Sequence, residues 1–156
     1  MKNNIHIWDS PLPVTSSEEQ LLLWRSYNEN QTDKTVSVQR LVEDNYVVLK
    51  KQYLSWIYDL GETHCQGKKI IDHLQLRPGF SFWWMTLISE KSNYSASPQI
   101  TDAIRLLAFS LWSLDNNIDS IRITSANKAL VECVQHWCRE RKIKFSWDRR
   151  SKRKAK

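Results

Sequence analysis

Residues 118–147, IDSIRITSANKALVECVQHWCRERKIKFSW, hold two alternating apolar stretches on either side of one amphipathic segment. Ile121 and Ile123 alternate with polar residues in the first stretch, as in a half-buried strand. The sequence Ser125-Ala-Asn127 then starts a helix, which carries apolar residues at helical spacing: Leu130, Val134 and Trp137. A last strand is predicted at 143–147. Strand, helix and strand in this order form a βαβ unit, whose two strands lie parallel in one sheet.

The remainder of the chain extends this unit into an α/β fold. Ile5 and Ile7 alternate around His6, which we expect to be a core or edge residue, in a strand that ends at the turn Trp8-Asp-Ser-Pro11. Periodicity and capping residues predict helices from Ser16 or Ser17 to Tyr27, from Arg40 to Leu60, and from Ser97-Pro98 to Leu114. We therefore expect one Rossmann-like three-layer domain over residues 1–148, with a mostly parallel sheet and flanking helices.

Nothing in the sequence predicts a cofactor. The chain has three Gly and no Gly-x-Gly-x-x-Gly motif, so a dinucleotide fingerprint is absent. The turn at 125–127 is predicted to cap a helix. The alternative is that its backbone N–H groups bind an anion.

The most unusual composition lies at 80–98, FSFWWMTLISEKSNYSASP, where five residues are aromatic. An apolar run of this kind marks a buried strand or helix segment. Adjacent residues of a strand face opposite sides, so one of Trp83 and Trp84 is expected to meet solvent, a partner or a ligand.

Two strings, SFWWMTLISEKSNYSASPQI at 81–100 and YLSWIYDLGE at 53–62, carry a resemblance. The chain from about Trp8 to about Trp147 resembles the N-terminal part of a family of bacterial surface-carbohydrate biosynthesis proteins. The resemblance implies a glycosyltransferase-like protein of two Rossmann domains that acts on lipopolysaccharide or capsule precursors. Family members are considerably longer than this chain, so we expect a truncated form without the second, donor-binding domain, inactive alone.

The positive charge of the chain is concentrated at one end. Six of its 23 basic residues lie at 149–156 with no acid among them, which leaves 17 basic against 17 acidic residues elsewhere. We expect this tail to be disordered. The alternative is that the tail binds anionic membrane lipid, at about 1 kcal/mol per basic residue. A neutral body does not favour nucleic acid.

The cysteines and histidines do not indicate a metal site. Cys133 and Cys138 lie on different faces of a predicted helix and read as buried hydrophobes. His64, Cys65 and His73 lack a fourth ligand at a recognisable spacing. The N-terminus has no apolar signal-peptide core, so we expect a cytoplasmic protein, peripheral to the inner membrane if the tail binds lipid.

Candidate site residues follow from the resemblance and from sugar chemistry. Transfer to an acceptor hydroxyl needs a base and cationic groups that face the departing phosphate. Glu90 is the candidate base, with Lys91 and Ser92 as contacts to an anionic sugar or phosphate. The alternative for Glu90 and Lys91 is a structural charge pair. Further candidates for contact with a sugar are two tryptophans, a strand-end carboxylate and a helix aromatic: Trp83, Trp84, Asp9 and Tyr58.

Two functions remain open at this point. The first is the acceptor-side domain of a glycosyltransferase-like protein, which requires a carbohydrate or lipid-linked acceptor and a donor-binding domain or subunit. The alternative is a non-catalytic remnant or docking subunit that binds a partner domain through an exposed aromatic surface.

Overall fold

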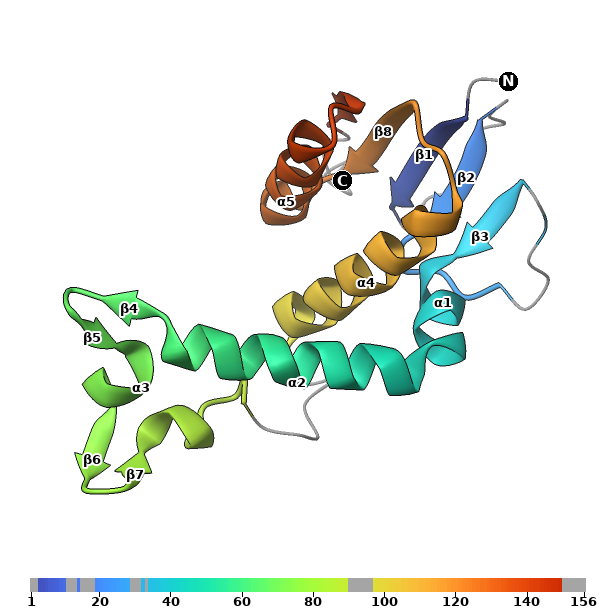
Figure 1. Ribbon diagram of the computed structural model, residues 1–156. Coiled ribbons are helices and arrows are strands. Elements are labelled where there is room, and N and C mark those ends of the chain that lie inside the picture. Colours follow the sequence, from blue (N-terminus) through green and yellow to red (C-terminus); the bar gives the residue numbers. More distant parts are fainter. Residues whose placement is uncertain are drawn as a thin grey trace, which may run out of the picture. The chain divides into compact units, whose positions relative to one another are not determined.

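A computed structural model describes residues 3–10, 14, 19–28, 32, 34–89 and 97–149 (Figure 1). The chain divides into two compact units. The first unit is formed by Met1–Asp44 and Ala108–Lys156, and the second by Asn45–Leu107. The sequence shows no linker-like segment at these boundaries, and helix α4 crosses one of them.

The first unit is built on a five-stranded sheet. Its strands, in the order β3-β2-β1-β8-β9, are all parallel. Their bounds are β1 (Asn4–Asp9), β2 (Gln20–Leu23), β3 (Thr35–Ser37), β8 (Ser120–Ser125) and β9 (Lys144–Asp148). This is a Rossmann-like α/β fold, as the sequence predicts.

Branched apolar residues on three central strands form the core of the sheet. Ile5 and Ile7 of β1 pair with Ile121 and Ile123 of β8, and Ile7 also pairs with Leu22 of β2. All five are buried. Fully buried Ile and Leu on both neighbours of a central strand are typical of a parallel sheet.

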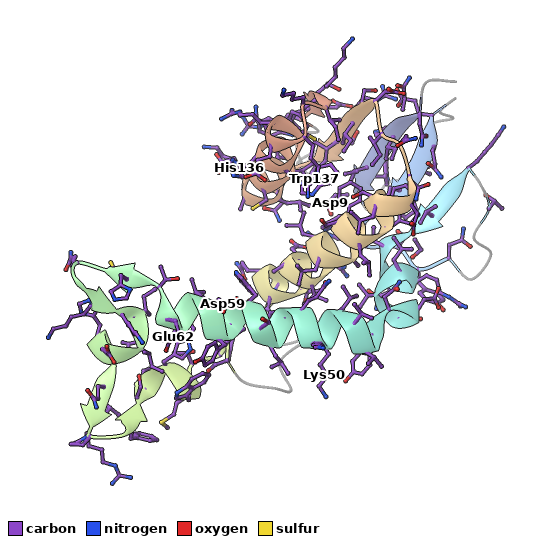
Figure 2. All side chains as sticks on the ribbon, in the orientation of Figure 1. Asp9, Lys50, Asp59, Glu62, His136 and Trp137 are labelled. Atoms are coloured by element: carbon purple, nitrogen blue, oxygen red, sulfur yellow. The ribbon has the colours of Figure 1, made fainter. Side chains whose placement is uncertain are left out.

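Helix α5 (Lys128–Glu140) connects β8 to β9 and confirms the predicted βαβ unit. Its N-cap is Asn127, whose side chain accepts a hydrogen bond from the backbone N–H of Leu130. Trp137 of α5 packs against Phe109 with ring centroids 4.9 Å apart. Figure 2 shows Trp137 and the exposed His136 on different sides of this helix.

Helix α4 (Pro98–Trp112) begins at the predicted proline and continues into a 3₁₀ turn, η2 (Ser113–Asp115). The first unit also contains the short helix α1 (Val38–Asp44). No helix within the described ranges is long and apolar enough to cross a bilayer.

The second unit combines one long helix with two hairpins. Helix α2 (Tyr46–Glu62) leads into the hairpin of β4 (His64–Cys65) and β5 (Lys68–Lys69), which Figure 1 shows at its end. The short helix α3 (Ile70–His73) follows, and then the hairpin of β6 (Gln75–Arg77) and β7 (Phe80–Ser81) and the 3₁₀ helix η1 (Phe82–Met85). Positive φ angles at Gln66 and Gly67 match the two-residue turn that joins β4 to β5.

Two predicted helices are corrected. The segment from Ser16 or Ser17 to Tyr27 was expected to be helical, but Gln20–Leu23 is strand β2, because Leu22 is buried between Ile7 and Val36. The start of that predicted helix lies outside the described residues. The helix predicted from Arg40 to Leu60 is two helices, separated at Asn45, where φ −113° and ψ 18° are not helical.

The prediction for the cysteines is half correct. Cys138 is fully buried, but Cys133 is exposed. Positions five apart on a helix face different directions, and only the face of Cys138 packs inward. The basic tail beyond Arg149 lies outside the described residues.

Candidate functional site

The carboxyl edge of the sheet contains a topological switch point between β1 and β8. The chain passes from β1 to β2 on one side, and β8 lies on the other side of β1. Open α/β sheets bind ligands at such a switch point, outside the carboxyl ends of the strands. Asp9 and Ser125 are the last residues of β1 and β8, and they are partners in the register of the two strands.

The Asp9 cluster, formed by Asp9, Arg25 and Ser125, lies at this switch point (Figure 2 labels Asp9). The Arg25 Nε donates to Asp9 Oδ1, and the Ser125 hydroxyl donates to Asp9 Oδ2 at 2.5 Å. The side chain of Asp9 is only 3% exposed, whereas that of Arg25 is 45% exposed. The cluster therefore combines a buried carboxylate with a cation that reaches solvent.

The start of α5 holds the serine of the cluster in place. The Ser125 hydroxyl oxygen accepts from the Asn127 backbone N–H at 2.9 Å. The Trp147 Nε1–H donates to the Ser125 carbonyl at 3.0 Å. Because an ionised carboxylate only accepts, the Ser125 hydroxyl donates its proton to Asp9. The helix start, the last strand and the carboxylate form one hydrogen-bonded unit.

His6 is buried in β1, as expected, and its ring is engaged on both nitrogens. Arg122 Nη2 lies 3.4 Å from His6 Nδ1, and Thr124 Oγ1 lies 2.8 Å from His6 Nε2. Arginine is only a donor, so Nδ1 accepts and Nε2–H donates to Thr124. Arg122 also binds Glu19 Oε2 at 2.7 Å. The His6 ring therefore links β1 to β8 through hydrogen bonds, which is a structural role.

The other predicted site residues belong to the second unit. Trp83 is buried and Trp84 is 48% exposed, which confirms the expectation that one of the pair meets solvent. The reason differs, since the two lie in η1 and not in a strand. Tyr58 of α2 is exposed. Glu90, Lys91 and Ser92 lie outside the described residues.

A metal centre finds no support in the part of the chain that the structure describes. No group of three or more His, Cys, Asp and Glu there could hold an ion. His73 Nε2 instead bonds to the Cys65 carbonyl at 2.6 Å, which ties α3 to the first hairpin.

Arg25 is the cluster residue that sequence reasoning missed. Residues 20–24 were read as helical, and this reading hides that Arg25 follows the end of a strand beside β1. Ser125 was recognised as a cap, but its contact with Asp9 spans 116 residues. No local pattern carries that information.

Comparison with known protein families, with curated proteins and with solved structures finds no match for this chain.

Proposed function

We propose that the chain binds a sugar ligand at the Asp9 cluster, as the acceptor-side domain of a glycosyltransferase-like protein of surface-polysaccharide assembly. The observation that carries this proposal is the buried carboxylate of Asp9 at the switch point of a Rossmann-like sheet. The resemblance of the strings at 53–62 and 81–100 supports the class of reaction.

The chemistry of the cluster suits an anionic ligand such as a sugar phosphate or a sugar acid. A carboxylate offers about four lone-pair directions, and Arg25 and Ser125 use two of those of Asp9. Because the side chain of Asp9 is only 3% exposed, its part in this proposal is to hold the Arg25 guanidinium in place, not to contact the ligand itself. The half-exposed guanidinium of Arg25 attracts a phosphate or a sugar acid, for which arginine is well suited.

In the transfer step, the acceptor hydroxyl loses its proton to a base as the bond between the donor sugar and its phosphate breaks. Glu90 remains the predicted base, with Lys91 and Ser92 as predicted contacts to the anion. A donor-binding domain or subunit is the partner that this function requires.

The test is calorimetric titration of the purified chain with nucleotide sugars (CMP-, UDP- and GDP-linked) and with oligosaccharide or lipid-linked acceptors. Asp9→Asn and Arg25→Gln are expected to weaken acceptor binding at least tenfold, as the loss of a charge-assisted hydrogen bond predicts. Asp44→Asn and Arg40→Gln are matched controls, because these residues form an exposed Asp–Arg pair in the same unit. Equal loss in both pairs, or no binding by wild type, would contradict the proposal.

A second candidate is the docking subunit. Ten of the thirteen exposed large hydrophobic residues of the described chain belong to the second unit, and five of them are aromatic: Tyr46, Trp56, Tyr58, Phe82 and Trp84. This richness in exposed rings favours a partner surface. If the chain binds none of the sugars in the titration, the docking subunit becomes the favoured function.

A further inference from the structure

An exposed apolar segment of the second unit runs from β6 through η1 to the residues that follow it. Five large apolar side chains within 76–87 are each 45% to 65% exposed: Leu76, Phe82, Trp84, Met85 and Leu87. We call residues 76–87 the apolar tip. Single exposed apolar residues are ordinary, but five within twelve positions are not.

The geometry of η1 turns three of these side chains outward: Phe82, Trp84 and Met85. A 3₁₀ helix has three residues per turn, so Phe82 and Met85 share one ridge, Trp84 forms a second and Trp83 the third. Trp83 is buried against Gly61 of α2. Because Trp83 packs on α2, the two ridges formed by Phe82 with Met85 and by Trp84 point away from α2.

Hydrogen bonds hold the apolar tip in this conformation. The Ser81 hydroxyl donates to the Ile71 carbonyl at 2.6 Å and accepts from the Trp83 backbone N–H. After η1, the Ser89 hydroxyl donates to the Trp83 carbonyl at 2.7 Å. The Tyr53 hydroxyl of α2 donates to the Ile88 carbonyl at 2.7 Å. The exposed rings are therefore presented by an anchored segment.

Two exposed basic residues accompany the apolar tip. Between residues 62 and 89 the chain has three basic residues, Lys68, Lys69 and Arg77, and two acids, Glu62 and Asp72, and Lys69 is paired with Glu62 at 2.6 Å. Lys68 and Arg77 are exposed, and Arg77 lies over the Phe80 ring, 5.3 Å from its centroid. Exposed apolar side chains together with the exposed cations Lys68 and Arg77 match the surface of an anionic bilayer, which offers acyl chains beneath negative headgroups.

We propose that the apolar tip is an interfacial membrane-binding surface, which places Trp84, Phe82 and Met85 among the headgroups of an anionic bilayer. Tryptophan and phenylalanine suit this depth because an amphipathic or polarisable ring bridges headgroup and acyl chain. Nucleic acid fits less well, since three of the five side chains are aliphatic and do not stack on bases. The apolar tip belongs to the second unit and the Asp9 cluster to the first, and this inference does not rest on the proposed sugar site.

The test is cosedimentation of the full chain with vesicles of phosphatidylcholine alone or mixed with phosphatidylglycerol. Wild type is expected to bind the anionic vesicles, with a blue shift of tryptophan fluorescence and weaker binding at high salt. Trp84→Ser combined with Met85→Ser is expected to weaken binding at least tenfold. Lys68→Gln and Arg77→Gln should each weaken it about fivefold.

Matched control variants distinguish vesicle binding by the apolar tip from non-specific adsorption and from binding by the basic tail. Val47→Ser and Lys50→Gln change exposed residues of α2 in the same unit and are expected to leave binding unchanged. Replacing Lys152, Arg153 and Lys154 by Gln tests the tail. Each variant is first checked for the wild-type circular dichroism spectrum and melting temperature.

Three results would overturn the inference. One is no binding of wild type to anionic vesicles, and another is binding that depends on the tail but not on Trp84 and Met85. The third is concentration-dependent dimerisation that Trp84→Ser abolishes without any vesicle binding, which would make the apolar tip a contact between two copies of the chain.

Discussion

A β-carbon at Gly61 would lie 2.8 Å from Nε1 of Trp83, so the indole of η1 packs directly on the backbone of α2. Atoms do not approach a β-carbon this closely, and the facing atoms belong to a rigid ring. The absence of a side chain at Gly61 therefore permits the contact that anchors the apolar tip.

Gly61→Ala is expected to destabilise the protein by about 1–3 kcal/mol, the usual cost of overpacking a filled site. In an open helix position the same change would stabilise, because alanine is the better helix former. The measurement is urea denaturation followed by circular dichroism. In a Trp83→Phe background the cost of Gly61→Ala should shrink, since the smaller ring vacates the space; an undiminished cost would mean that another contact is responsible.

The three thiols are expected to react in two classes. Cys65 and Cys133 are exposed and Cys138 is fully buried. Burial also raises the pKa of the Cys138 thiol to about 11, which suppresses the reactive thiolate. Titration with a chromogenic disulfide reagent at neutral pH should therefore find two fast thiols in the native protein and three in denaturant. Three fast thiols without denaturant would contradict the packing of α5.

The same thiol makes stability depend on alkaline pH. Above its ordinary pKa of 9.0, Cys138 loses its proton in the unfolded chain but keeps it in the folded protein up to about pH 11. The unfolded state then binds fewer protons, so stability falls with rising pH across this window, by up to about 1.4 kcal/mol per pH unit. Cys138→Ala should remove this slope, measured as the difference from wild type in urea denaturation between pH 8 and pH 11. Parallel curves for the two proteins would contradict it.

Asp9→Ala is expected to lower the free energy of unfolding by about 1–3 kcal/mol, since it removes a buried carboxylate that accepts from Arg25 and Ser125. Asp44→Ala removes an exposed carboxylate paired to Arg40, and should cost less than about 1 kcal/mol. Both changes are read by urea denaturation at neutral pH. Equal costs would mean that burial adds nothing to the pairing of Asp9.

The sequence by itself determined the βαβ unit of 118–147, the opening strand and the start of α4. These features depend on residues close together in the chain: the alternation of Ile121 and Ile123, the cap at Asn127 and the proline at position 98. The Rossmann-like class follows from them, because parallel strands joined by a helix belong to such a sheet.

Only the tertiary structure decided where β2 lies, where the long helix breaks and which side chains meet. Leu22 is strand rather than helix because Ile7 and Val36 surround it, and neither is near it in the sequence. The Asp9 cluster joins β1 to β8 across 116 residues, and the packing of Trp83 on Gly61 decides which aromatic residues of η1 are left outside. The local sequence pattern indicates whether a segment favours helix or strand. Sites and surfaces depend on contacts that form only when distant segments pack together.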